Sequence, residues 1–211
     1  MIAAWVEDEL KLLDLGDSRL DRRAKLCISQ FSRIAASTPD ACQGVAELEA
    51  TYRLARNPKA QMIDILSEHN RSTILRTKGD RVVYLIQDTT EVDLTKPKRQ
   101  VEGAGPLGTN QKRGFYFHPL YAVNSDGVVQ GVVDQVVWAR ESIETKLTDA
   151  EKSKRRKQLC FEEKESCRWL DMQQSGEQIA RANPETNYIC VADSEADILS
   201  LIHISEPTRP Y

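Results

Sequence analysis

The sequence predicts an α+β protein, with a helical N-terminal domain over residues 1–78 and a mixed-sheet core over residues 79–198. Two observations predict this division. Before Lys78-Gly79-Asp80, apolar residues recur at helical spacing, and after it β-branched residues are concentrated in short runs. The 211 residues, 40% of them hydrophobic, are enough for one core and a smaller helical domain.

The N-terminal domain contains several segments with helical spacing of apolar residues. They are residues 4–15, 16–37, 44–57 and 60–77. Asp17 can cap the second segment, and Pro58 ends the third. The sequence at 38–40, Thr-Pro-Asp, predicts a break between the second and third helices.

The core domain is expected to contain strands, a hairpin and a helix. The first strand, "RVVYLIQDTT" at residues 81–90, reaches Asp88. A loop rich in Gly, Pro and Lys follows over residues 94–114, and loops of that length tend to be functional. The hairpin and the helix are expected at residues 115–140 and 160–183, and the last strand is expected from residue 188 to Asp193.

Bulk properties argue against several classes of protein. No apolar run of about 18 residues is present, so no membrane partner is expected, and the acidic N-terminus does not resemble a signal peptide. Five cysteines without a CxxC pair predict reduced thiols in the cytoplasm rather than disulfides or a zinc site. The net charge of −3 argues against a strongly basic nucleic-acid-binding domain, although the distribution of charge matters more than the sum.

Basic residues do cluster locally, and these clusters are candidates for phosphate contacts. They are Arg19, Arg22, Arg23 and Lys25; Lys96, Lys98 and Arg99; Lys112 and Arg113; and residues 152–157. Taken singly, each cluster is more typical of a solvated surface.

Two predicted strands lead directly into aspartates, Asp88 after the first strand and Asp193 after the last. Ligand sites in open α/β sheets lie at strand ends, so these carboxylates would face one point if the strands were neighbours. Close carboxylates repel each other unless a cation lies between them, and hard oxygen ligands suit Mg²⁺ or Mn²⁺. The alternative is a set of unrelated loop acids, with Glu195 and Asp197 starting a helix.

Several motifs in one order resemble the cut-and-paste DDE transposases of bacterial insertion sequences, and within them the Tn-five transposase type. They are "LGDSRLDRR", "YRLARNP", "IQDTT", the glycine-rich basic loop leading to "GFYFHPL", "EEKESCRWL" and "VADSEADI", and they span about residues 15–198. The resemblance implies a helical domain that grips transposon-end DNA, followed by a truncated RNase H-like α/β core with a mixed sheet.

The resemblance also implies roles for individual residues. Asp88 and Asp193 match the first two catalytic carboxylates, which in such enzymes hold two Mg²⁺ ions for DNA cleavage and strand transfer. Arg19 and Arg23 fall where the family's arginines meet transposon-end DNA. The basic loops are expected to bind phosphates through Lys98, Arg99, Lys112 and Arg113. The family has an Arg directly after the second catalytic Asp, but this chain has Ser194 at that position, so a role for a basic side chain at that position is in doubt. The implied partners are double-stranded transposon-end and target DNA and a second copy of the chain.

The family's third carboxylate, a Glu on a downstream helix, has no counterpart before Tyr211. Residues 199–211 break the family pattern and resemble the translation of a sequencing adapter, so we interpret them as a non-native tail. The chain is then a fragment for which little or no cleavage is expected. Two alternatives stay open: a truncated transposase that binds DNA ends and inhibits, and another RNase H-like nuclease completed by Glu195 or Asp197.

Other conspicuous residues have structural interpretations. Tyr52 and Arg53 are expected to brace the N-terminal helices. His118 is expected to pack among aromatic residues, and Trp138 and Trp169 are expected in the core. The acids of "EEKES" are expected to have surface or structural roles.

Overall fold

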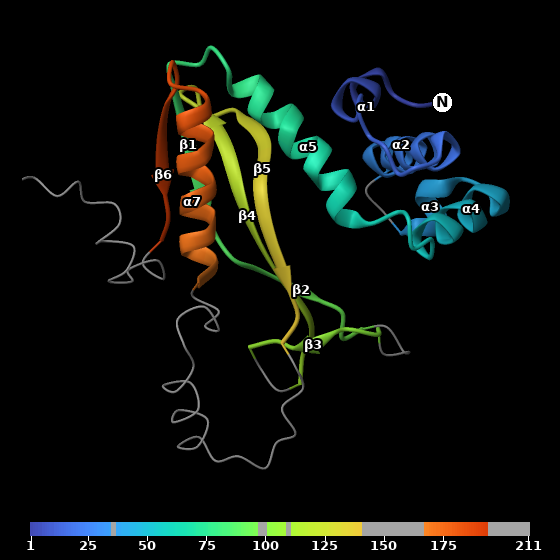
Figure 1. Cartoon of the computed structure of the whole chain (residues 1–211). Helices are drawn as coiled ribbons and strands as arrows, with labels where there is room; N and C mark the ends of the chain where they lie inside the picture. Colours follow the sequence, from blue (N-terminus) through green and yellow to red (C-terminus); the bar gives the residue numbers. More distant parts are fainter. Residues whose placement is uncertain (35–36, 97–100, 109–110, 141–166, 194–211) are drawn as a thin grey trace, which may run out of the picture. The chain divides into compact units, whose positions relative to one another are not determined.

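The computed structural model describes residues 1–34, 37–96, 101–108, 111–140 and 167–193 (Figure 1). The chain forms two compact units, Met1–Arg76 and Thr77–Tyr211. The first is helical and the second is built on a mixed sheet, so the predicted α+β class is confirmed. No helix in the described part of the chain is both long and apolar enough to cross a membrane.

Helices build the N-terminal part of the chain. They are α1 (Ala4–Glu9), α2 (Ser18–Arg33), α3 (Thr38–Cys42), α4 (Val45–Ala55) and α5 (Met62–Thr77). The four predicted helices are present, but the predicted break at 38–40 is wrong, because these residues start α3. Pro39 lies in the first turn of α3, where its missing N–H costs no helical hydrogen bond. Gln43 ends α3 in the left-handed conformation, with φ of 53°.

A small apolar core holds the first unit together. Its buried residues are Val6, Leu10, Leu13, Leu15 and Ala24. Leu20 of α2 and Leu54 of α4 are partly buried against this core. Asp17 caps α2, since its side chain accepts a hydrogen bond of 2.9 Å from the backbone N–H of Arg19. The core and the cap together fix which face of α2 is presented to solvent.

The second unit contains a mixed sheet of six strands among the described residues. They are β1 (Val82–Gln87), β2 (Thr90–Asp93), β3 (Gly105–Pro106), β4 (Arg113–Asn124), β5 (Val129–Trp138) and β6 (Asn187–Val191). The long strand β4 pairs antiparallel with β1, β2, β3 and β5, whereas β6 pairs parallel with β1. The predicted first strand, hairpin and last strand are confirmed.

The prediction of one long loop over residues 94–114 is wrong in part. The short strand β3 forms within it, and β2 directly precedes it. Gly105 and Gly114 lie opposite each other and let the strands approach closely. A Cβ at Gly114 would lie 1.8 Å from the Val92 backbone oxygen, and one at Gly105 would lie 1.9 Å from that of Arg140.

The helix α7 (Cys167–Ala182) packs against β1, β4, β5 and β6 (Figure 1). Its buried residues recur at helical spacing and are Trp169, Met172, Gly176 and Ile179. Gly176 allows close approach to the sheet, since a Cβ there would lie 3.0 Å from Cδ1 of Leu85. Residues of β1 alternate, so that Val83, Leu85 and Gln87 are buried while Tyr84 and Ile86 are exposed.

Candidate carboxylate site and DNA interface

The parallel pair of β1 and β6 brings two of the predicted acids to one edge of the sheet. Ile86 lies opposite Val191 in this register. Asp88 and Asp193 come two residues further along each strand, so continuation of the register places them level with each other. Both aspartates are exposed. Neighbouring parallel strands lie about 4.8 Å apart, which is close enough for two carboxylates to share a cation.

The Asp88 carboxylate is held by its own turn, because Oδ1 accepts a hydrogen bond of 2.7 Å from the Thr89 backbone N–H. Below the turn lies His118 of β4, which is completely buried. Its Nε2 lies 3.1 Å from Gln87 Oε1, and its Nδ1 lies 2.9 Å from Thr89 Oγ1. The ring of His118 meets that of Trp169 edge-on, with centroids 4.6 Å apart. The prediction of a packed histidine is therefore confirmed.

The electrostatics of His118 link it to both aspartates. Burial, followed by the nearby positive charge of Arg168, lowers the pKa of His118 to about 4. The negative charges of Asp88 and Asp193 oppose this shift, so both carboxylates act on the same imidazole. His118 is accordingly neutral near pH 7 and serves the site as a hydrogen-bonding group.

The two carboxylates fit a hard divalent cation. Mg²⁺ and Mn²⁺ bind through few carboxylates and keep water molecules as their other ligands, which suits an exposed pair of aspartates. Among the described residues, no group of three or more His, Cys, Asp or Glu side chains is arranged to hold a metal ion. The prediction that Asp88 and Asp193 bind a metal ion therefore rests on the proximity of these two carboxylates, without a third ligand among the described residues.

A hollow in the first unit gathers arginines from two helices. It has a volume of about 390 Å³ and is lined by Arg19, Leu20, Arg22, Arg23 and Leu26 of α2, by Ala50, Arg53 and Leu54 of α4, and by Asn57. Residues three and four apart on a helix share one face, which explains why Arg19, Arg22 and Arg23 line the hollow together. Leu20 and Leu54 anchor the two helices to the core, so their arginines are held side by side.

Two of these arginines are paired with acids of the same unit. Arg19 Nη2 lies 2.9 Å from Asp17 Oδ2, and this side-chain hydrogen bond lowers the pKa of Asp17. Arg23 Nη1 lies 2.5 Å from Glu47 Oε2, which likewise lowers the pKa of Glu47. The Arg19 side chain is 90% exposed, so its guanidinium remains accessible to a phosphate.

Arg22 and Arg53 are exposed, and neither has an ion-pair partner among the described residues. The expectation that Tyr52 and Arg53 brace the helices stays a prediction, since Tyr52 is 42% exposed and Arg53 lies on the hollow. Arg22 belongs to the basic cluster that the sequence identified around Arg19. Arg53 could not be found in this way, because its place depends on the packing of α4 beside α2.

The predicted phosphate-binding loops are described only in part. Lys112 is exposed and lies 3.8 Å from Asp93. Arg113 is half-buried and donates from Nη2 to the backbone oxygen of Ala104 at 2.8 Å, so it ties β4 to the loop before it. Other residues and segments named above lie outside the described residues: Lys98, Arg99, residues 152–157, the acids of "EEKES" (Glu163 and Glu165 among them), Ser194, Glu195, Asp197 and residues 199–211. Of the two tryptophans expected in the core, Trp169 is buried and Trp138 is half-buried.

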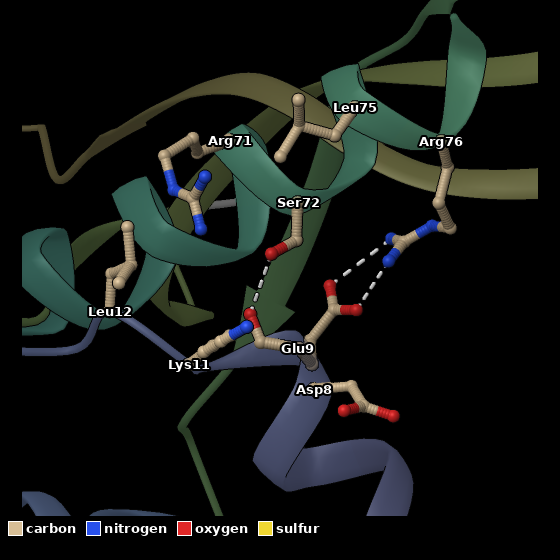
Figure 2. A pocket seen from close by; sticks show the side chains of 8 residues that line it. All are labelled: Asp8, Glu9, Lys11, Leu12, Arg71, Ser72, Leu75 and Arg76. Atoms are coloured by element: carbon tan, nitrogen blue, oxygen red, sulfur yellow. Dashed lines mark hydrogen bonds and ion pairs between the residues drawn. The ribbon is translucent and has the colours of Figure 1, made fainter.

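A second hollow, of about 510 Å³, lies between α1 and α5 (Figure 2). Figure 2 shows Glu9 at its centre, paired with Arg76, while Ser72 Oγ donates to the Glu9 backbone oxygen at 2.7 Å. Arg71, on its rim, is paired with Glu68 at 2.8 Å. These charges are compensated within the unit, and we interpret this hollow as a structural tie between α1 and α5.

Residues 2–60 match the family model described as "Transposase DNA-binding", and the match covers both α2 and α4. No curated protein matches the chain. The arginine-lined hollow lies within the matched segment, which supports DNA as a partner. Residues 2–60 are thus similar to transposase DNA-binding domains, and this supports a DNA-binding transposase.

Proposed function

We propose that this chain is part of a bacterial insertion-sequence DDE transposase of the Tn-five transposase type, which binds transposon-end DNA and cleaves it with divalent metal ions. The observation that carries the proposal is the juxtaposition of Asp88 and Asp193 in a chain whose residues 2–60 match transposase DNA-binding domains. Strand-end carboxylates and a DNA-binding unit are the parts that metal-dependent phosphodiester chemistry on DNA needs.

The sheet supports interpretation of the second unit as an RNase H-like core. The strand β4 pairs antiparallel with β1 and β5, the strand β6 pairs parallel with β1, and α7 packs on these strands. The proximity of Asp88 and Asp193 that follows from this register supports their roles as the first two catalytic carboxylates implied by the resemblance.

The arginines of the hollow are the proposed DNA contacts. Guanidinium groups bind phosphates and guanine edges through paired hydrogen bonds, so Arg19, Arg22, Arg23 and Arg53 can both grip and read a duplex. On binding, Arg19 and Arg23 exchange Asp17 and Glu47 for DNA. A homodimer that engages two transposon ends follows from the same proposal.

Asp88 and Asp193 are the residues that would hold Mg²⁺ or Mn²⁺. Such an ion supplies Lewis acidity for in-line displacement at a phosphodiester and favours ionisation of a water molecule. Both carboxylates are exposed, so a DNA phosphate can approach them directly. His118, neutral and buried, supports the Asp88 turn from below.

DNA binding is tested with single-arginine variants of the full chain. The probe is a labelled duplex from the DNA that flanks the gene, compared with a scrambled duplex over a range of salt concentrations. We expect Arg22→Ala and Arg53→Ala each to weaken binding by roughly 1–3 kcal/mol where the residue contacts a base, or to reduce the salt slope by about 1 where it contacts a phosphate. Arg33→Ala, an exposed position on α2 outside the hollow, is the matched control. Equal effects of all three variants would contradict the proposed interface.

Metal binding is tested by Mn²⁺ titration of the full chain, followed by electron paramagnetic resonance. Asp88→Asn and Asp193→Asn should each abolish the bound-ion signal, because a single carboxylate holds Mn²⁺ poorly. Asp126→Asn, in the exposed hairpin turn, removes the same charge elsewhere in the unit and should leave the signal unchanged. A bound signal that survives both site variants would exclude the carboxylate pair as the metal site.

A further inference from the structure

Both neighbours of Asp88 in the sequence take part in one partly buried chain of hydrogen bonds. Gln87 Oε1 lies 3.1 Å from His118 Nε2, and His118 Nδ1 lies 2.9 Å from Thr89 Oγ1. The chain ends at α7, where Arg168 Nε donates to Thr89 Oγ1 at 2.9 Å. Asp88 is thus exposed between two residues whose side chains are anchored beneath the sheet edge.

Gln87 fixes the direction of the hydrogen bonds in this chain. Its Oε1 can only accept, so His118 carries its proton on Nε2 and donates it to Gln87. Nδ1 of the neutral ring is then an acceptor, so Thr89 Oγ1 gives its one proton to His118 and accepts a hydrogen bond from Arg168. The other neutral tautomer of His118 would leave the contact with Gln87 without a proton.

Arg168 is itself held by aromatic rings. Its guanidinium carbon lies 5.3 Å from the ring centroid of Trp138 and 5.4 Å from that of Trp169. Trp138 stacks on Tyr116 with centroids 5.1 Å apart, and Arg140 lies over Tyr116 at 4.4 Å. Contacts of this kind restrict the guanidinium, so that Arg168 is a fixed donor rather than a freely moving surface cation.

We propose that Arg168 is a positioning residue for the Asp88 carboxylate, acting through Thr89 and His118 to fix the backbone on both sides of Asp88. This inference rests on the proposed function, because the purpose of fixing Asp88 is to hold a divalent cation together with Asp193. Residues that orient a metal ligand through hydrogen bonds commonly change metal affinity by 10–100-fold when they are replaced. Arg168 and Thr89 do not themselves bind the ion in this proposal.

The test uses Thr89→Val and Arg168→Met in the full chain, with two measurements. Mn²⁺ affinity is followed by electron paramagnetic resonance, and hydrogen exchange of the backbone between β1 and β2 is followed in the metal-free chain. Each variant is expected to weaken Mn²⁺ binding by about 10-fold and to speed exchange at Thr89. The double variant should lose no more affinity than either single variant, because both break the same chain.

Two controls separate positioning from a loss of folding. Thr90→Val makes the same substitution at the exposed neighbouring residue and should leave both measurements unchanged. Thr89→Ser keeps the hydroxyl group and should restore Mn²⁺ affinity, which a general packing defect would not allow. If Thr89→Val does not fold, the Mn²⁺ affinities of Thr89→Ser and Arg168→Met are compared instead. Positioning by Arg168 predicts weaker binding in Arg168→Met and unchanged binding in Thr89→Ser.

The possible outcomes distinguish this inference from the proposed function. If the unsubstituted chain binds Mn²⁺ and the variants bind it equally well with unchanged exchange, the positioning role is overturned and the metal site stands. If the unsubstituted chain binds no Mn²⁺, the metal site fails and the inference fails with it. Weaker binding together with faster exchange supports both.

Discussion

The arginine-lined hollow and the carboxylate edge are built in opposite ways. In the hollow, three of the four arginines come from adjacent turns of α2 and are partly or fully exposed. Two of them, Arg19 and Arg23, are paired with nearby acids. At the edge, Asp88 and Asp193 come from distant parts of the chain, and both neighbours of Asp88 are held by hydrogen bonds to side chains beneath it. Each substitution in the hollow should therefore weaken DNA binding by its own separate amount. At the edge, one substitution should weaken Mn²⁺ binding as much as several, because each group in the hydrogen-bond chain depends on the next.

The largest expected effect comes from Trp169→Ala, which removes the ring that packs on His118 and lies near Arg168. Trp169 is 1% exposed, and truncation of a buried Trp costs about 3–5 kcal/mol of unfolding free energy. Urea denaturation measures this loss, and Mn²⁺ binding should be lost in parallel. Phe31→Ala, an exposed aromatic position on α2, is the control and should change the unfolding free energy little. Similar losses for the two variants would remove the distinction between the edge and the rest of the molecule.

A smaller effect is expected from pH. The pKa of His118 falls from 6.5 to about 4 on folding, so the unfolded chain binds the proton more readily than the folded one. The corresponding stability is fully present above pH 6.5 and is lost as the pH falls toward 4, with a magnitude on the order of 3 kcal/mol. Urea denaturation at several pH values measures it, and His118→Gln should flatten the dependence between pH 6.5 and 4. An unchanged slope in the variant would mean that other groups cause the acid sensitivity.

The smallest expected effect tests the hollow. Glu47→Gln removes the charge that competes with DNA for Arg23, so DNA binding should strengthen by about two- to five-fold. The gain should shrink as salt is added, because the competing pair is partly exposed. A gel shift measures the change in binding. Glu49→Gln, two residues further along α4, makes the same charge change at an exposed position outside the hollow and serves as the control. Weaker binding by Glu47→Gln would mean that Glu47 orients Arg23 for DNA instead of competing with it.

Much of the fold follows from local patterns in the sequence. Helical spacing predicted α2 and α4, and the β-branched runs predicted β1 and the β4–β5 hairpin. The short strands β2 and β3 were missed, because each is held by pairing with β4 rather than by its own composition. α3 was missed because Thr-Pro-Asp suits both a turn and a helix start.

The candidate site was only partly accessible from sequence. Asp88 and Asp193 were predicted from their places at strand ends, and the β1/β6 register places them at one edge. Their metal binding stays a prediction. The link from Arg168 to Thr89 could not be predicted, because Thr89 comes before the β4–β5 hairpin in the sequence and Arg168 of α7 comes after it. Tertiary packing alone brings such residues together.

The parallel pairing of β6 with β1 has a consequence for the order of folding. The strands β2 to β5 and the helix α7 all lie between these two partners in the chain. Contacts between residues so distant in sequence close a large loop, and their entropic cost makes them slow to form. The β4–β5 hairpin needs only a short turn and can form much earlier. The edge with both aspartates should therefore be completed late in folding, after the part of the sheet that supports it from below.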